Sequence, residues 1–355
     1  MEKRAVIKQN KIDSGKVFIS PIVGPGYTPE NGLLLGGGAL ITFKTNRKDS
    51  LIQRSSLPVT AFISTKGNIG LNVKMASFWN EDKIRFNFVS RVVKATDDYF
   101  GVGFETADNI EKGESTSSYK RVGFFFTPEF QYRIVKSLYA GVLVDLNQTD
   151  VKEVNEIMLN DSNYIKYGPN NFNTGVGVTL TYDSRDISVN AYKGMLAKIF
   201  FTRYTDALGG DNTYSVYEVD LRKYYQINRP GNTFAVRLDG RFATGDVPYS
   251  ELSVIGGNDA LRGYLTGKYR DKTAIFLIPE WRYMFLKSDG KMSKHGVVAW
   301  AGLGTMADSV KEINKFVPNG GIGYRFEVQP RMNVRIDFGV GKEAHGLYFN
   351  FTEAF

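Results

Sequence analysis

The sequence predicts an all-β protein, a transmembrane antiparallel β-barrel of about 16 strands, and three observations support this prediction. Runs of about ten residues alternate apolar with polar or charged side chains along most of the chain. The composition is rich in aromatic residues and glycine, with 25 Phe, 20 Tyr and 37 Gly but only 11 Pro. Nowhere is there an apolar run of about 18 residues, which excludes a transmembrane helix and leaves strands as the spanning element.

The alternation places lipid-like side chains on one face of a strand and full charges on the other. Phe234, Val236 and Leu238, for example, alternate with Arg237 and Asp239. A large soluble protein with two β-sandwiches is the alternative fold. It would require charged faces on nearly every strand without a matching hydrophobic core elsewhere, so the barrel is favoured.

The lengths of the connections support the same architecture. Short connections follow even-numbered predicted strands, as at 65–67, 226–231 and 329–332, whereas the two longest connections, at 147–171 and 245–272, follow odd-numbered ones. Short periplasmic turns and long outer loops are typical of outer-membrane barrels. We therefore expect residues 1–31 to form a periplasmic segment and residues 32–355 to form the barrel, with strands near 32–45, 55–64, 68–78, 83–93, 99–107, 119–132, 137–146, 172–183, 194–206, 213–225, 232–244, 273–285, 295–306, 318–329, 333–341 and 345–355. Pro279 predicts a local break in its strand.

Few residues are suited to catalysis or metal binding. There is no Cys, which excludes disulfides and thiolate sites, and of the two histidines only His345, next to Glu343, is a catalytic candidate; a solvated surface histidine is the alternative. We expect no enzyme activity, metal or cofactor. The formal charge of +8 suits anionic lipid headgroups or lipopolysaccharide at the rims, or a basic lumen. No compact Lys/Arg patch with exposed aromatics indicates nucleic-acid binding.

The long connection after the eleventh predicted strand contains Leu261-Arg262-Gly263-Tyr264. Apolar neighbours of Arg262 indicate that this segment packs against other residues. If the loop folds into the barrel, Arg262 enters a low-dielectric lumen and must pair with a carboxylate. Glu280, on the lumen face of the next predicted strand, is the nearest candidate.

A second motif, Asp183-Ser184-Arg185-Asp186, follows the eighth predicted strand. Side chains of Asp and Ser cap the backbone in turns, and Arg185 can bridge Asp183 and Asp186. The motif therefore predicts a rigid periplasmic turn.

Three glycines, Gly36, Gly37 and Gly38, lie in the first predicted strand, and the last one ends at Phe355. Glycine weakens strand pairing through lost packing and extra chain entropy. Since the first and last strands of a barrel close against each other, we predict a weak lateral seam between them.

These motifs, together with Arg335-Ile336-Asp337 and the aromatic carboxyl terminus, resemble the BamA/TamA-type outer-membrane assembly-factor family, also described as bacterial surface-antigen barrels, over roughly residues 20–355. The resemblance implies that Arg262 reaches into the lumen and binds acids, with Glu280 as the acid of strand 12. Gly302 stands where the resemblance places a second acid. Family members that assemble or secrete proteins carry POTRA domains, and residues 1–31 are too short for one, so we expect a barrel without them.

The resemblance also implies a function. We expect a multi-pass barrel in the bacterial outer membrane, with its signal peptide removed, that acts in protein or lipid assembly or transport through a lateral seam and a loop-gated lumen. Its expected partners are outer-membrane lipids or lipopolysaccharide, and periplasmic or assembly-machine subunits that replace the POTRA domains. A passive pore and the barrel half of a secretion system are the alternatives.

Overall fold

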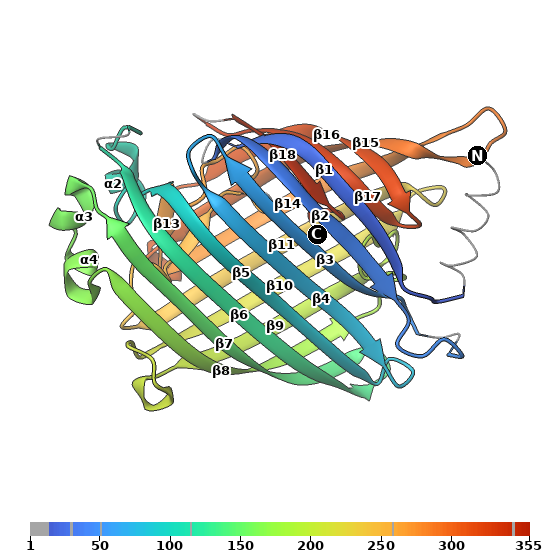
Figure 1. Cartoon of the computed structure of the whole chain (residues 1–355), viewed down its shortest axis with the longest axis horizontal. Coiled ribbons are helices and arrows are strands. Elements are labelled where there is room, and N and C mark those ends of the chain that lie inside the picture. The colour runs from blue at the N-terminus through green and yellow to red at the C-terminus, as the bar shows by residue number, and fades with distance from the viewer. Residues whose placement is uncertain (1–13, 29–30, 50–51, 114–115, 258, 343–344) are drawn as a thin grey trace.

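The structure is a computed structural model that describes residues 14–28, 31–49, 52–113, 116–257, 259–342 and 345–355. Its strands form a closed antiparallel barrel of 16 strands, in the order β1-β18-β17-β16-β15-β14-β11-β10-β9-β8-β7-β6-β5-β4-β3-β2 (Figure 1). A separate two-stranded sheet, β12-β13, lies in the connection between β11 and β14. The predicted all-β barrel of 16 strands is therefore confirmed.

The barrel strands are between 7 and 18 residues long. They are β1 (Phe18–Thr28), β2 (Gly32–Phe43), β3 (Ser55–Ser64), β4 (Ile69–Trp79), β5 (Ile84–Asp98), β6 (Ser118–Val135), β7 (Leu138–Glu153), β8 (Asn170–Asp183), β9 (Gly194–Tyr204), β10 (Tyr214–Gln226), β11 (Asn232–Gly245), β14 (Thr273–Leu286), β15 (Met292–Ala307), β16 (Val317–Gln329), β17 (Met332–Val340) and β18 (His345–Phe351). The connections contain β12 (Ser253–Ile255), β13 (Tyr269–Asp271), α2 (Phe104–Asp108), α3 (Glu156–Asn160), α4 (Ser162–Tyr167) and the 3₁₀ turns η1 (Asp206–Leu208) and η2 (Val310–Glu312).

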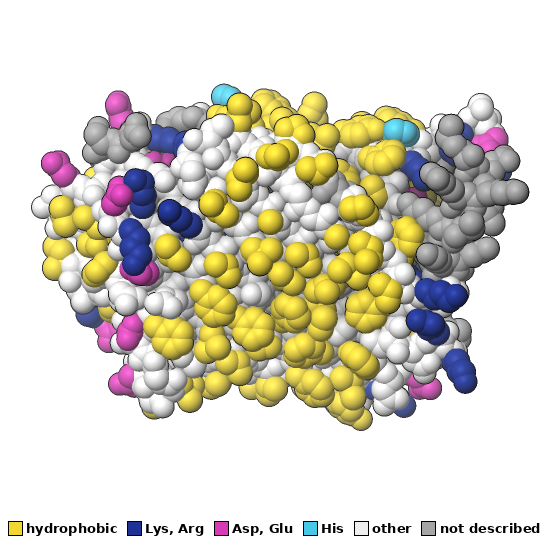
Figure 2. Space-filling model, viewed as in Figure 1, with side chains coloured by type: hydrophobic (Ala, Val, Ile, Leu, Met, Phe, Trp, Pro, Cys, Tyr) yellow, Lys and Arg dark blue, Asp and Glu magenta, His cyan; other side chains and the backbone are white. Residues whose placement is uncertain are grey.

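Alternating side chains face the two sides of the wall. Along β14, Leu277 and Trp281 are exposed on the outside, whereas Ile278, Glu280 and Arg282 are buried on the inside. Figure 2 shows the result on one side of the molecule: hydrophobic side chains gather over the middle of the wall, and most charged ones lie toward its two ends. Among the helices that the structure describes, none is long and apolar enough to cross a membrane.

Successive connections alternate between the two ends of the barrel because neighbouring strands are antiparallel. One end, here named the loop end, carries α2, α3, α4 and the long β11–β14 connection (Figure 1). The other, the turn end, carries the β2–β3, β8–β9 and β16–β17 connections. The short connection at 65–67 joins β3 to β4 and therefore lies at the loop end, not at the turn end where its length had placed it.

Two strand predictions were wrong. One strand was missed and one was predicted that does not form, so the total of 16 strands is unchanged. Residues 18–28 form β1, so the barrel begins before residue 32 and the predicted boundary between a 1–31 segment and the barrel does not hold; residues 1–13 lie outside the described part. Residues 99–107, predicted as a strand, instead lead into α2. Gly101 (φ 74°) and Gly103 (φ 86°) adopt left-handed backbone conformations that end the strand pattern.

Pro279 interrupts one ladder, as predicted. The pairing of β14 with β15 passes from Leu277↔Leu303 to Glu280↔Trp300, and the two intervening residues make no registered pair. The register is the same on both sides of the gap, so the proline removes local pairing without shifting the strands.

The largest hydrophobic cluster of the described residues lies within the barrel and includes part of the long connection. Leu261, Tyr264 and Leu265 pack with Ile278 of β14 and Trp300 of β15. The connection thus covers the inner face of this part of the wall and positions the site described below.

Candidate functional site

Arg262 lies at the centre of the site, where its side chain is fully buried. Nη2 donates to Glu280 Oε2 of β14 at 2.5 Å, and Nη1 donates to Asp337 Oδ2 of β17 at 2.5 Å. The guanidinium carbon lies 3.5 Å from the centroid of the Trp300 ring. A planar guanidinium can bind two carboxylates and stack on an indole at the same time, which the point charge of a lysine cannot do.

Further arginines on the inner wall share the same acids. Asp337 also accepts hydrogen bonds from Arg325 Nη1 at 2.5 Å and from Arg335 Nη1 at 2.9 Å. Glu280 Oε1 accepts from Arg282 Nε at 2.7 Å. Each buried acid therefore contacts more than one cation, so the network supplies the pairing that buried charges require.

Asp259 attaches the same connection to the wall at a second place. Its side chain forms an ion pair with Arg335, and its carbonyl oxygen accepts a hydrogen bond from Arg237 Nη1 of β11 at 3.1 Å. The segment from Asp259 to Arg262 is thus held by three strands, β11, β14 and β17, that are not all neighbours in the sheet.

Two glycines allow the connection to approach the wall closely. Gly263 has φ 113°, and a Cβ built on it would lie 2.5 Å from the carbonyl carbon of Val340. A Cβ on Gly339 would lie 2.6 Å from the carbonyl oxygen of Arg262. The amide of Gly263 also donates to the Tyr348 hydroxyl at 2.9 Å. The glycine after Arg262 is therefore required by backbone conformation and by space.

The carboxyl-terminal residues 352–355, here named the tail, turn inward after β18. Thr352 has a left-handed φ of 63°. Glu353 Oε2 accepts a hydrogen bond from Arg325 Nε at 2.7 Å, and the carbonyl oxygen of Phe355 accepts one from Arg282 Nη2 at 2.9 Å. Phe355 is 6% exposed and lies in the inner hydrophobic cluster. It therefore belongs to the lumen and not to the strand edge where the sequence analysis had placed it.

The junction of β1 with β18 is the lateral seam, and it is short. Among the described residues this junction has one registered pair, Tyr27↔Leu347, whereas β1 pairs with β2 along all 11 of its residues. Pro21 and Pro25 are four residues apart, so their nitrogen atoms face the same edge of β1. Because the ladder with β2 is continuous, that edge is the one toward β18, which therefore lacks two hydrogen-bond donors.

The predicted seam residues lie one strand away from this junction. Gly36, Gly37 and Gly38 are in β2 and pair with both β1 and β3. The error follows from the missed β1, because the strand taken as first in the barrel is the second.

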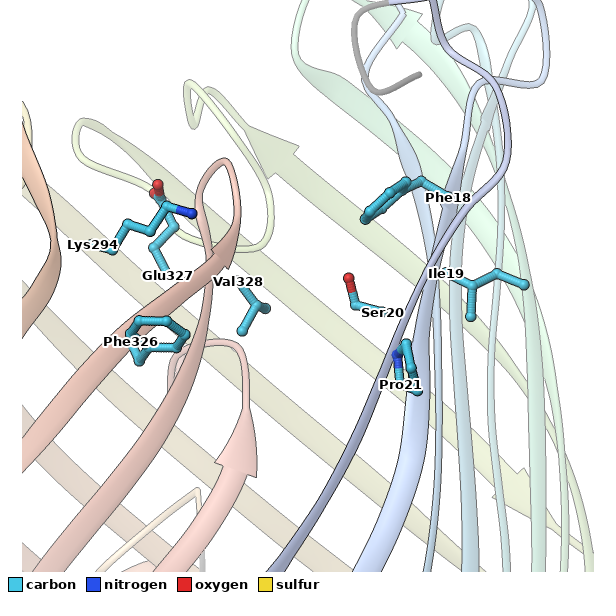
Figure 3. Close-up of a pocket in the computed structure, with 8 residues that line it drawn as sticks. All are labelled: Phe18, Ile19, Ser20, Pro21, Lys294, Phe326, Glu327 and Val328. Atoms are coloured by element: carbon cyan, nitrogen blue, oxygen red, sulfur yellow. The ribbon is translucent and has the colours of Figure 1, made fainter. Parts of the chain in front are cut away.

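A pocket lies beside the seam at the turn end (Figure 3). On its inner side Gln329 Nε2 donates to Ser20 Oγ at 2.9 Å, and Gln329 Oε1 accepts from Thr42 Oγ1 at 2.9 Å. Side-chain contacts thus connect β16 to β1 and β2 where the backbone ladder is missing. The pocket has a volume of about 290 Å³ and is lined by Phe18, Ile19, Ser20, Pro21, Lys294, Phe326, Glu327 and Val328.

The Asp183–Asp186 motif lies at the turn end. Asp183 accepts from Arg185 Nε at 2.8 Å and from Arg85 Nη1 of β5 at 2.8 Å. Asp186 Oδ2 accepts a hydrogen bond from Arg331 Nη2 at 2.8 Å. Among the described contacts, Arg185 binds Asp183 and does not bridge it to Asp186. The motif therefore reaches beyond its own turn, to the connection between β16 and β17.

One acid of the long connection has an altered protonation equilibrium. Glu251, between β11 and β12, is 8% exposed, and burial raises its pKa to about 7 although Arg241 opposes the shift. The loop end therefore contains a carboxyl group that titrates near neutral pH.

The second acid of the Arg262 site was not expected on β17. Gly302, where the resemblance had placed an acid, instead leaves room for Leu261, whose Cδ2 would lie 3.2 Å from a Cβ at that position. Asp337 occurs in the Arg335-Ile336-Asp337 motif noted in the sequence, but nothing in the sequence connected it to Arg262. Of the catalytic candidates, Glu343 lies outside the described residues.

Comparisons with known proteins agree with this architecture. A family model described as an Omp85 superfamily domain matches residues 65–341. BamA from Haemophilus ducreyi lacking POTRA domains 1–3 has a similar structure, with a TM-score of 0.58 and 13% identity over 94% of this chain and 69% of that one. CdiB from Acinetobacter baumannii (TM-score 0.57, 13% identity, 95% and 59% coverage) and CdiB from Escherichia coli (0.55, 11%, 95% and 62%) are also similar. The chain thus spans less than two thirds of either CdiB chain. No curated protein sequence gave a match.

Proposed function

We propose that this chain, which belongs to the Omp85 superfamily and is a β-barrel of the bacterial outer membrane, accelerates the insertion of β-strand polypeptides into that membrane by opening between β1 and β18. The short junction of these two strands is the observation that carries the proposal. In the part of the chain that the structure describes, every other pair of neighbouring barrel strands has at least six registered pairs, whereas this junction has one.

An open edge of β1 offers backbone groups to an incoming strand. Strands add to exposed sheet edges through main-chain hydrogen bonds, which do not depend on the sequence of the added strand. An edge of this kind therefore suits a protein that handles many different β-strand substrates.

Energetic considerations favour a route for the substrate polypeptide through the wall, at the seam, over a route through the lumen. Parting the seam breaks few backbone hydrogen bonds, each with a net contribution of about 1 kcal/mol. Clearing the lumen requires Arg262 to leave Glu280 and Asp337, and breaking a buried ion pair costs about 3–5 kcal/mol. A passive pore would also require the lumen to be cleared, so the same energetic cost disfavours that alternative.

A disulfide across the seam tests the proposal. Tyr27 and Leu347 are directly opposite each other, both side chains point outward, and the chain has no other thiol. The Tyr27→Cys/Leu347→Cys variant, reconstituted in liposomes, should speed the folding of an unfolded outer-membrane barrel substrate when reduced and should lose that effect when oxidised.

The matched control is Leu221→Cys/Leu238→Cys, a registered outward pair between β10 and β11. Oxidation of this control variant should leave the rate of substrate folding unchanged. Equal rates for the oxidised and reduced seam variant, or no acceleration by the reduced protein, would contradict the proposed function.

A further inference from the structure

We infer that the β8–β9 connection, residues 184–193 and here named the brace, holds the lateral seam closed by binding the strand connections on both sides of it, with Arg331 as the positioning residue. The inference rests on the proposed function, because it describes the control of the same seam. It is argued from three sets of contacts made by the brace.

Arg331 connects the brace to the carboxyl-terminal side of the seam. It lies in the connection of residues 330–331 between β16 and β17. Its Nη2 donates to Asp186 Oδ2 at 2.8 Å, its Nε donates to the carbonyl oxygen of Asn190 at 3.0 Å, and its guanidinium carbon lies 3.4 Å from the centroid of the Tyr192 ring. One side chain thus makes an ion pair, a backbone contact and a stacking contact with the brace.

The backbone of Arg331 adds to this observation. Its φ is 63°, in the left-handed region that residues other than glycine rarely adopt. Positive φ at the second residue of a two-residue turn that begins with proline is typical of type II turns, and here the turn joins the paired Gln329 and Met332, with the Arg331 amide donating to Glu327 Oε2 at 3.0 Å. The backbone conformation thus fixes the place of Arg331 in the turn, from which its guanidinium reaches Asp186 of the brace.

Ser188 connects the brace to the amino-terminal side of the seam. Its amide donates to Gln53 Oε1 at 3.2 Å, and Gln53 lies in the connection between β2 and β3. The β2–β3 and β16–β17 connections lie on opposite sides of the β1/β18 junction. A single segment therefore contacts both sides at the turn end, where the described residues of β1 and β18 form no registered pair.

The brace also lies close to the tail. Ala191 belongs to the same hydrophobic cluster as Ala354 and Phe355. Asn190 and Tyr192 line a small cavity together with Glu353. The brace thus covers the residues that would have to leave the lumen if β18 were to lengthen or move.

The brace is also held by contacts within itself and, through Asp183, by β5. Asp186 Oδ1 accepts from the Tyr192 amide at 3.0 Å, which closes the segment on itself. At its start, Asp183 is bound by Arg185 and by Arg85 of β5. A segment fixed in this way can resist outward movement of the β16–β17 connection, so opening of the seam requires Arg331 or Gln53 to release it.

Spin labels across the seam test the inference on the full chain in liposomes. Val23 on β1 and Ile336 on β17 both point outward and have β18 between them. Labels on cysteines at these positions should give a single short distance in the wild-type background. Arg331→Ala should increase a longer-distance population about tenfold, the ratio that corresponds to about 1.4 kcal/mol, close to the lower limit for a hydrogen bond to a charged group.

Two controls make the result specific. The first is Arg229→Ala: Arg229 also lies at the turn end, donates to a backbone carbonyl at 2.6 Å and stacks on Tyr283, but its recorded contacts do not include the brace. It should leave the distance unchanged. The second is a label pair at Val178 on β8 and Tyr217 on β10, with β9 between them, which should not respond to Arg331→Ala.

The outcomes separate this inference from the proposed function. A longer seam distance in Arg331→Ala, reproduced by Tyr192→Leu and reversed in part by Arg331→Lys, supports the brace. An unchanged seam distance in both Arg331→Ala and Tyr192→Leu overturns it, even if the seam disulfide blocks insertion. If the distance lengthens but the protein never accelerates insertion, the brace stands and the proposed function fails.

Discussion

Replacing Arg262 with alanine should release the long connection from the inner wall. Arg262 makes two ion pairs at full burial and stacks on Trp300. Breaking a buried pair costs about 3–5 kcal/mol. The lower end applies here, because Glu280 keeps Arg282 and Asp337 keeps Arg325 after the substitution. At about 1.4 kcal/mol per factor of ten, about 3 kcal/mol corresponds to a released population roughly 100-fold larger.

A buried thiol next to Arg262 measures that population. Leu261 is 0% exposed, and Leu261→Cys is the only thiol in a chain without native cysteine. The rate at which a water-soluble maleimide labels it follows the fraction of molecules in which the connection has left the wall. Arg262→Ala should raise this labelling rate about 100-fold relative to the protein that carries Leu261→Cys alone. Both proteins carry Leu261→Cys, so any destabilisation by that substitution cancels in the comparison.

Arg222→Ala is the matched control. Arg222 also lies on the inner wall and pairs with Asp220 of its own strand, and none of its recorded contacts is to the long connection. Its replacement should leave the labelling rate unchanged. A rate increase below about threefold for Arg262→Ala would refute the reasoning, because it corresponds to less than about 0.7 kcal/mol.

Two further predictions concern the same connection. Gly263→Ala should raise the labelling of Leu261→Cys, because its Cβ would lie 2.5 Å from Val340 at φ 113°, whereas Gly290→Ala, which has a similarly positive φ of 77° but nothing within 4 Å, should not. The folded pKa of Glu251, about 7, is above its usual value, so the folded state holds the proton more strongly and stability falls as the pH rises from about 4.5 to about 7. The loss should approach about 3 kcal/mol, and Glu251→Gln should flatten this part of the thermal stability profile; an unchanged slope would contradict the assignment.

The alternating strands could be predicted because a barrel wall divides lipid from lumen, and this leaves a period of two in each strand. β1 was missed because its Pro21, Gly24, Pro25 and Gly26 are typical of a loop. Proline is tolerated there because one edge of β1 is almost free of ladder pairing. The property that hid this strand from the sequence is therefore the same one that makes it the edge of the seam.

The contents of the lumen were only partly predictable. A buried arginine between apolar residues requires an acid, and Glu280 was the nearest one in the next strand. Asp337 lies 75 residues from Arg262, and Arg331 lies 145 residues from Asp186. Pairs at such separations depend on the closure of the barrel and on its diameter, which a single sequence does not specify.

The inward tail has a consequence for the order of folding. Ala191 of the brace belongs to the same hydrophobic cluster as Ala354 and Phe355, which follow it in the sequence by more than 160 residues. The brace therefore precedes the tail in synthesis by roughly 160 residues but cannot complete its packing until the tail has entered the lumen. We expect the barrel to close late, with β8 and β9 already formed and the connection between them docking among the final steps.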